Sequence, residues 1–278
     1  MLLAVLAPLA ACATAARGNL EPIVTDRPDF TESSEIVPSG LVQLESGGTY
    51  SRDGDERAGS LGEALIRVGL APRAELRVGL NSYAFSQVSG STVRGLEDAS
   101  LGAKFNLFDG GALGSARPKV SLIVHSTLPT GAQPFRANKM QPEMKLIGAW
   151  TLSERFAFAS NLNYAVVRER FDSYAEPSAS ASVAIGLSQR VGSYVEYFGF
   201  YPQQEGLDKS HYMNGGLTYG LSDNLQLDAR AGRQVQRLGD GQSWFMGVGI
   251  ARRWEPVVPY AGRAPLPSGE RRPASRTS

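Results

Sequence analysis

The sequence has very little cysteine and histidine, and each shortage excludes a class of protein. A single cysteine can form neither an internal disulfide framework nor a cysteine zinc cluster. Two histidines, His125 and His211, leave little room for a histidine metal site. The 28 basic and 27 acidic residues nearly cancel, and no basic stripe carries interleaved aromatic residues. We therefore expect no metal, no other cofactor and no nucleic-acid partner.

A long hydrophobic run is also missing, because no apolar stretch approaches the roughly 20 residues of a membrane-spanning helix. Hydrophobic residues instead alternate with polar ones, as leucine and alanine do with glutamine, aspartate and arginine in residues 224–233. A period of two predicts strands with one apolar and one polar face, and a helical period fits poorly. About twelve such segments, of about 9–12 residues each, have the length of a transmembrane β-strand. They are residues 41–50, 62–70, 74–82, 98–108, 118–128, 143–152, 155–167, 178–188, 193–201, 211–221, 224–233 and 243–254.

The gaps between these segments alternate between long and short. Long polar gaps lie at 51–60, 85–96, 129–142, 168–177, 202–211 and 234–241, and short turns at 71–74, 153–155, 189–193 and 222–224, with an intermediate turn at 109–118. Outer-membrane barrels have long external loops and short periplasmic turns. The sequence therefore predicts an all-β fold over residues 41–254: a transmembrane antiparallel up-and-down β-barrel of about 12 strands, with both termini in the periplasm.

Aromatic residues near the strand ends agree with a membrane interface, although aromatic residues also favour strands in general. They are Tyr50, Phe105, Trp150, Tyr164, Tyr219 and Trp254. Trp254 closes the last strand and is similar to the terminal aromatic residue that outer-membrane barrels present to their assembly machinery. We therefore expect outer-membrane lipid and the barrel-assembly machinery as partners of a monomeric protein.

The segments outside the barrel are expected to be an export signal, a linker and a tail. Residues 1–16 read as a signal peptide, with Ala13-Thr14-Ala15 as an ordinary cleavage site. Alternatively, Leu9-Ala10-Ala11-Cys12 resembles a lipobox, in which Cys12 would become the lipidated N-terminus. Residues 17–40 are polar and contain three prolines, so we expect an irregular periplasmic segment. Residues 255–278 are rich in proline and arginine and are expected to be disordered.

The N-terminal side carries a specific motif, "TDRPDFTESSEIVPSGLVQLESGGTY", from Thr25 to Tyr50. Further motifs follow as far as Trp254: "VHSTLPTG", "VEYFGFY", "GGLTYGLSDNLQLDARAG" and the closing "WFMGVGIARRW". These motifs resemble one bacterial outer-membrane family, which is associated with the meta-cleavage pathway of phenol degradation and whose members are often named transporters. The resemblance implies a β-barrel that moves small solutes, aromatic ones among them, and no defined catalytic residues.

Strand alternation places a nearly balanced set of charges on the lumen side. The pore-lining candidates are Glu45, Glu63, Arg67, Glu75, Arg77, Asp98, Lys104, Glu143, Lys145, Glu196, Asp228 and Arg230. They could line a water path and orient a polar solute, or pair across strands and fill the interior. The number of strands does not distinguish these two interpretations, because eight strands leave a filled interior, sixteen leave an aqueous channel, and about twelve lies between them. The balance of signs argues against strong ion selectivity.

A dense cluster of charges precedes the first strand, formed by Asp26, Arg27, Asp29 and Glu32. We interpret it as a small plug in the periplasmic mouth, with Arg27 paired to a lumen carboxylate and Phe30 as an apolar anchor. The alternative is a linker whose prolines prevent strand pairing.

The sequence does not favour an enzyme. His125 and Ser126 are adjacent, so in a strand they point to opposite faces and cannot form a nucleophile–base pair. We therefore predict an outer-membrane channel or transporter in a Gram-negative bacterium that passes small solutes, hydrophobic or aromatic compounds among them. The alternative is a closed structural or surface-interaction barrel without transport.

Overall fold

The structure is a computed structural model that describes residues 20–168, 172–236 and 243–254. The predicted signal peptide, Cys12 and the tail at 255–278 lie outside the described residues. The described residues contain no helix that is long and apolar enough to span a membrane.

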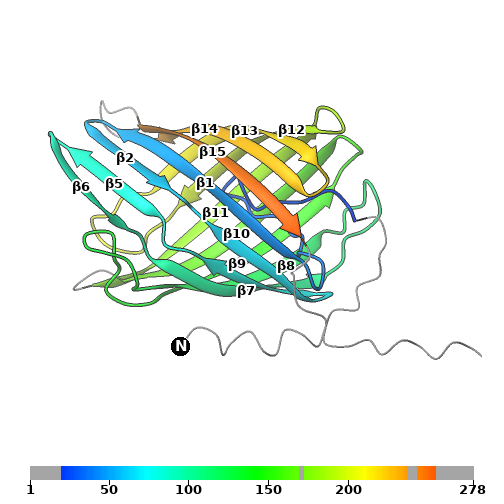
Figure 1. Ribbon diagram of the computed structural model, residues 1–278, viewed down its shortest axis with the longest axis horizontal. Coiled ribbons are helices and arrows are strands. Elements are labelled where there is room, and N and C mark those ends of the chain that lie inside the picture. Colours follow the sequence, from blue (N-terminus) through cyan, green and yellow to red (C-terminus); the bar gives the residue numbers. More distant parts are fainter. Residues whose placement is uncertain (1–19, 169–171, 237–242, 255–278) are drawn as a thin grey trace, which may run out of the picture.

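Fifteen β-strands form one closed antiparallel sheet (Figure 1). Three pairs of strands, β2 with β3, β4 with β5 and β6 with β7, continue one another across short breaks, so the barrel has 12 staves. β1 closes the barrel by pairing with the last strand from Val42↔Trp254 to Asp53↔Ser243. The predicted fold class is therefore confirmed. The strands are β1 (Val42–Asp53), β2 (Glu56–Leu61), β3 (Leu65–Ala71), β4 (Ala74–Gly79), β5 (Tyr83–Val88), β6 (Ser91–Leu96), β7 (Ala99–Phe108), β8 (Lys119–Leu128), β9 (Gln141–Thr151), β10 (Phe156–Arg168), β11 (Ser173–Gly186), β12 (Val191–Phe200), β13 (Ser210–Ser222), β14 (Leu225–Gln236) and β15 (Ser243–Trp254).

Two of the predicted long loops are instead strand hairpins. β1 and β2 pair up to Asp53↔Glu56, and β5 and β6 pair up to Val88↔Ser91. Gly54 has a φ of 58°, and Ser89 and Gly90 have φ values of 48° and 84°, as two-residue hairpin turns require. The polar composition of these segments suggested loops, but a hairpin with water on both faces needs no apolar alternation to pair its backbone.

The two ends of the barrel differ in their connections. One end, called here the short-turn end, carries the turn at 72–73, the loop at 109–118 and the turns at 152–155, 187–190 and 223–224. Val42 and Trp254 pair at this same end, so the barrel domain begins and finishes there.

The barrel is polar inside and apolar outside. Arg67, Lys104 and Glu75 face the interior and are 0% exposed, whereas Val248 and Leu162 face outward and are 65% and 63% exposed. A water-soluble protein has the opposite arrangement, with its charges outside and its apolar residues buried. An apolar outer surface around a polar lumen is instead the pattern of a barrel embedded in lipid.

An irregular segment, residues 20–41, runs into the barrel from the short-turn end; it is the dark blue trace inside the barrel in Figure 1. We call it the plug. Near its start, the Ile23 amide donates to the Asp223 carbonyl over 2.7 Å. Near its end, the Gly40 amide donates to the Gly69 carbonyl over 2.8 Å. Both ends of the plug therefore lie at the short-turn end, and its middle lies in the lumen.

Candidate functional site

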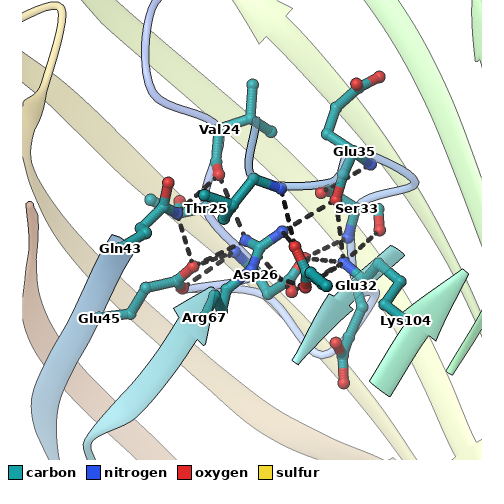
Figure 2. Close-up of polar contacts among 12 residues, drawn as sticks. Val24, Thr25, Asp26, Glu32, Ser33, Glu35, Gln43, Glu45, Arg67 and Lys104 are labelled. Atoms are coloured by element: carbon teal, nitrogen blue, oxygen red, sulfur yellow. Dashed lines mark hydrogen bonds and ion pairs between the residues drawn. The ribbon is translucent and has the colours of Figure 1, made fainter. Parts of the chain in front are cut away.

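The ionic contacts of the plug centre on Asp26, which lies among basic side chains from three strands (Figure 2). The Asp26 carboxylate is 2.5 Å from Arg77 Nη1, 2.9 Å from Lys104 Nζ and 3.3 Å from Arg67 Nη1. Lumen carboxylates of the barrel wall share these cations: Glu75 lies 2.9 Å from Arg67 Nε, and Glu45 lies 2.8 Å from Arg67 Nη1.

We call this group the Asp26 cluster. Its members are Asp26, Glu45, Glu75, Arg67, Arg77 and Lys104. Three carboxylates and three cations are neutral as a set, which buried charges require because an uncompensated one is costly. The neutrality depends on the plug, since the wall alone contributes three cations and two carboxylates.

Carboxylates of the barrel wall also bind the backbone of the plug at three places. Glu45 Oε2 accepts the amides of Asp26 and Arg27, each over 3.0 Å. Glu196 accepts the amides of Phe30 over 2.9 Å and Thr31 over 2.5 Å.

The third place is near the end of the plug, where Glu75 Oε2 accepts the Val37 amide over 2.8 Å. An irregular segment inside a barrel cannot satisfy its own amides, so these charge-assisted hydrogen bonds replace the missing secondary structure. The wall is thus chemically complementary to the plug.

Two further charged residues of the plug, Arg27 and Glu32, also pair with the wall. Arg27 Nη1 lies 2.7 Å from Glu63, and Arg27 Nη2 lies 3.9 Å from Asp228. Glu32 bridges Arg77 at 2.6 Å and Lys145 at 2.8 Å. The plug therefore contacts opposite charges from widely separated strands of the wall.

These surroundings shift the carboxyl groups of the plug in different directions. Burial alone would raise the pKa of Asp26, but Arg67, Lys104 and Arg77 hold that pKa well below its usual value. Burial opposes ionisation of Glu32 as well, yet Arg77 and Lys145 lower its pKa to about 2. For Asp29, burial and the nearby Glu196 carboxylate raise the pKa well above the usual value.

The structure brings most of the predicted lumen residues to the plug, and sets two apart. Arg230 donates to the Pro28 carbonyl over 2.8 Å and so also contacts the plug. Glu143 pairs with His125 at 2.6 Å on the wall. Asp98 falls in the break between β6 and β7, where it accepts the amides of Gly131 and Ala137 and anchors the loop after β8.

Other polar contacts of the plug come from residues that sequence reasoning did not single out. Gln43 donates to the Val24 carbonyl over 2.9 Å, and Arg253 donates to the Glu21 carbonyl over 2.6 Å. Ser121 donates to the Ser34 carbonyl over 2.7 Å. All three lie on the polar face of a strand, so alternation gave their direction, but only the fold shows that the plug passes beside them.

Two cavities border the plug. One of about 690 Å³ lies toward the short-turn end and is lined by Ser34, Ala159 and Tyr194 among others. The second, of about 320 Å³, lies on the side of β3, β4, β7 and β8. Arg27 and Glu32 line both cavities, so the plug separates these two spaces of the lumen. The described residues form no group of three or more His, Cys, Asp or Glu side chains suited to a metal ion.

The closed 12-stave antiparallel barrel, apolar outside and charged inside, defines an outer-membrane β-barrel of the kind that Gram-negative bacteria use as channels and porins. The chain belongs to the family described as "Putative MetA-pathway of phenol degradation", whose model matches residues 25–254. The resemblance seen in the sequence motifs is thereby confirmed.

Solved structures share the fold at low sequence identity. The COG4313 outer membrane channel from Pseudomonas putida F1 is 15% identical, with a TM-score of 0.60 over 80% of this chain and 98% of that chain. The NanC porin is 8% identical, with a TM-score of 0.52 over 75% of this chain and 98% of that chain. The translocator domain of the autotransporter NalP from Neisseria meningitidis is 11% identical, with a TM-score of 0.51 over 78% of this chain and 90% of that chain. No curated protein sequence matches the chain.

Proposed function

We propose that the protein is an outer-membrane channel for small solutes, aromatic compounds among them, and that the plug closes its lumen. The short-turn end would face the periplasm, as it does in outer-membrane barrels generally. The plug would then be the periplasmic gate of the channel.

The observation that carries this proposal is how the wall holds the plug. Glu45 and Glu196 each accept two backbone amides of the plug, in addition to the side chains of Arg67 and Asn214 on neighbouring strands. A barrel with a purely structural interior would fill it with pairs of wall side chains. A wall whose polar groups bind a separate segment instead indicates a lumen that water and solutes can occupy when that segment leaves.

The alternative of a closed structural barrel rests on the wall pairs alone. Arg67 contacts both Glu45 and Glu75 without help from the plug. Those pairs, like the pair of His125 with Glu143, need no plug, but they do not account for the contacts that Glu196 and Arg230 make with the plug.

The described lumen gives no support to an enzyme. Ser126 donates its hydroxyl to the Thr127 carbonyl over 3.1 Å, while His125 pairs with Glu143. The neighbouring serine and histidine therefore serve different partners, and no nucleophile–base pair forms between them.

Single-channel conductance in a planar lipid bilayer tests the proposal. We expect rare openings for the full chain and a large, steady conductance for a variant that lacks residues 19–38. Arg73→Ala is a matched control, because its partner Asp109 lies on the exposed short-turn surface, away from the plug. A folded deletion variant with the same conductance as the full chain would refute the gate and favour the closed barrel.

A further inference from the structure

One region of the mostly polar lumen wall is built from aromatic rings. Phe198 stacks on Tyr212 with ring centroids 5.0 Å apart and planes 12° apart. Phe200 meets Phe198 edge to face at 6.0 Å, and Phe245 lies 6.4 Å from Phe198. We call these four wall residues, Phe198, Phe200, Tyr212 and Phe245, the ring seat.

Strand geometry explains why the four rings meet. Phe198 and Phe200 follow Glu196 at intervals of two, so all three side chains share the lumen face of β12. Tyr212 is directly opposite Phe198 in the β12–β13 register. Phe245 is opposite Gly232 on β14, where the missing side chain leaves room for its ring.

The plug places a fifth ring on this seat. Phe30 stacks on Phe198 with centroids 4.6 Å apart and planes 14° apart, and meets Phe200 edge to face at 5.3 Å. Phe198 is therefore sandwiched between Phe30 and Tyr212. Phe30 is the only aromatic residue of the plug, and its amide is held by Glu196.

A polar group with an unused acceptor lies beside the seat. Asn214 Nδ2 donates to Glu196 Oε2 over 2.6 Å, which fixes the orientation of the amide. Its Oδ1 is buried and has no hydrogen-bond partner among the described residues. Asn214 also leans over Gly232 next to the Phe245 ring. A buried acceptor without a donor is costly, so this position favours a ligand that supplies a hydroxyl hydrogen.

Arg230 adds a complementary feature beside Phe245. Its guanidinium lies 5.6 Å from the centroid of that ring, and its buried Nε has no hydrogen-bond partner in the part of the chain that the structure describes. An acceptor and a donor, each without a partner among the described residues, therefore lie beside Phe245. A phenolic hydroxyl can both donate and accept a hydrogen bond, whereas a plain hydrocarbon ring can do neither.

We propose that the ring seat is a binding site for small phenols and that the Phe30 ring occupies it when no ligand is bound. A phenol would take the position of the Phe30 ring against Phe198, with its hydroxyl toward Asn214 or Arg230. This inference rests on the proposed channel function, because displacing Phe30 would loosen the plug at Glu196 and open the lumen. The Asp26 cluster would keep the plug tethered, so the displacement is reversible.

Binding of 4-fluorophenol to the detergent-solubilised full chain, followed by fluorine NMR, tests the site without requiring conductance. Phe30→Ala should bind about tenfold more tightly, the factor that corresponds to removing one competing aromatic pair. Phe198→Ala should lose binding by at least a similar factor. Phe105→Ala is the matched control and should be unchanged, because Phe105 is 41% exposed on the outer surface.

Several outcomes would overturn the inference. Unchanged affinity in Phe30→Ala would show that Phe30 does not compete for the site. Equal affinity in Phe198→Ala and Phe105→Ala would place the binding elsewhere, provided that both variants retain the heat-resistant folded band of a barrel on a gel. If cyclohexanol displaced 4-fluorophenol as strongly as phenol does, binding would not depend on a flat aromatic ring.

The same variants separate this inference from the channel itself. If the plug deletion conducts but 4-fluorophenol binding is insensitive to Phe30 and Phe198, the channel stands and the ring seat is wrong. If binding follows the expected pattern but no variant conducts, the ring seat stands and the proposed transport is wrong.

Discussion

Replacing Asp26 with asparagine should release the plug while leaving the barrel intact. The substitution keeps the shape of the side chain and removes its charge. Within the Asp26 cluster, three cations then remain with only Glu45 and Glu75, while Glu32 stays shared between Arg77 and Lys145. Two of those cations, Arg67 and Lys104, are fully buried, so the excess positive charge has no water to stabilise it while the plug is seated.

The magnitude follows from the burial of the cluster. Breaking a buried ion pair by removing one partner costs about 3–5 kcal/mol. Release of the plug admits water to the cluster and limits the penalty, so we take the lower end of that range. About 3 kcal/mol corresponds to about a 150-fold shift in the equilibrium between seated and released plug.

The assay is the open probability of single channels in a planar bilayer. We expect Asp26→Asn to raise the open probability by about two orders of magnitude when the parent channel is mostly closed. Asp109→Asn is the matched control, since it removes one carboxylate from an exposed pair with Arg73 that is worth at most about 1 kcal/mol.

A second substitution should reverse the effect of Asp26→Asn on the open probability. Lys104→Met in the Asp26→Asn background removes one of the three cations and restores neutrality, so the open probability should fall back towards the parent value. An Asp26→Asn channel that stays closed, or a double variant that opens further, would refute the electrostatic account of the plug.

Three further predictions concern the charges of the plug. The pKa of Asp29 is raised while the plug is seated, so seating weakens as the pH rises above the usual pKa of an aspartate. Asp29→Asn should therefore flatten the rise in open probability between acidic and neutral pH. Glu32 has a pKa of about 2, so its contribution to seating is lost as the pH falls below about 4, and Glu32→Gln should remove that acid-induced opening. Residues 19–38 carry five carboxylates and one arginine, so their deletion should shift the reversal potential in a KCl gradient towards anion selectivity; an unchanged potential would contradict this.

The barrel was predictable because its signal is local. Each strand carries its own alternation, and the predicted segment at 243–254 coincides with β15. The hairpins formed by β1 with β2 and by β5 with β6 were less visible, since hairpins in water need no apolar face. Polar composition there indicated loops where the backbone forms strands.

The chemistry of the lumen was only half predictable. Alternation gave the direction of Glu45, Arg67 and Glu196, since a side chain two residues along a strand returns to the same face. It could not give their partners, which come from strands and segments far away in the chain.

What the sequence alone determined, then, is the barrel and the polarity of its two faces. The tertiary structure decided where residues 20–41 lie and what they touch. A proline-rich polar segment has no preferred conformation of its own, so its position depends on distant partners such as Glu196 for the Phe30 amide and Arg77 for Asp26. Those partners become neighbours only when β15 pairs with β1 and the sheet closes around the plug.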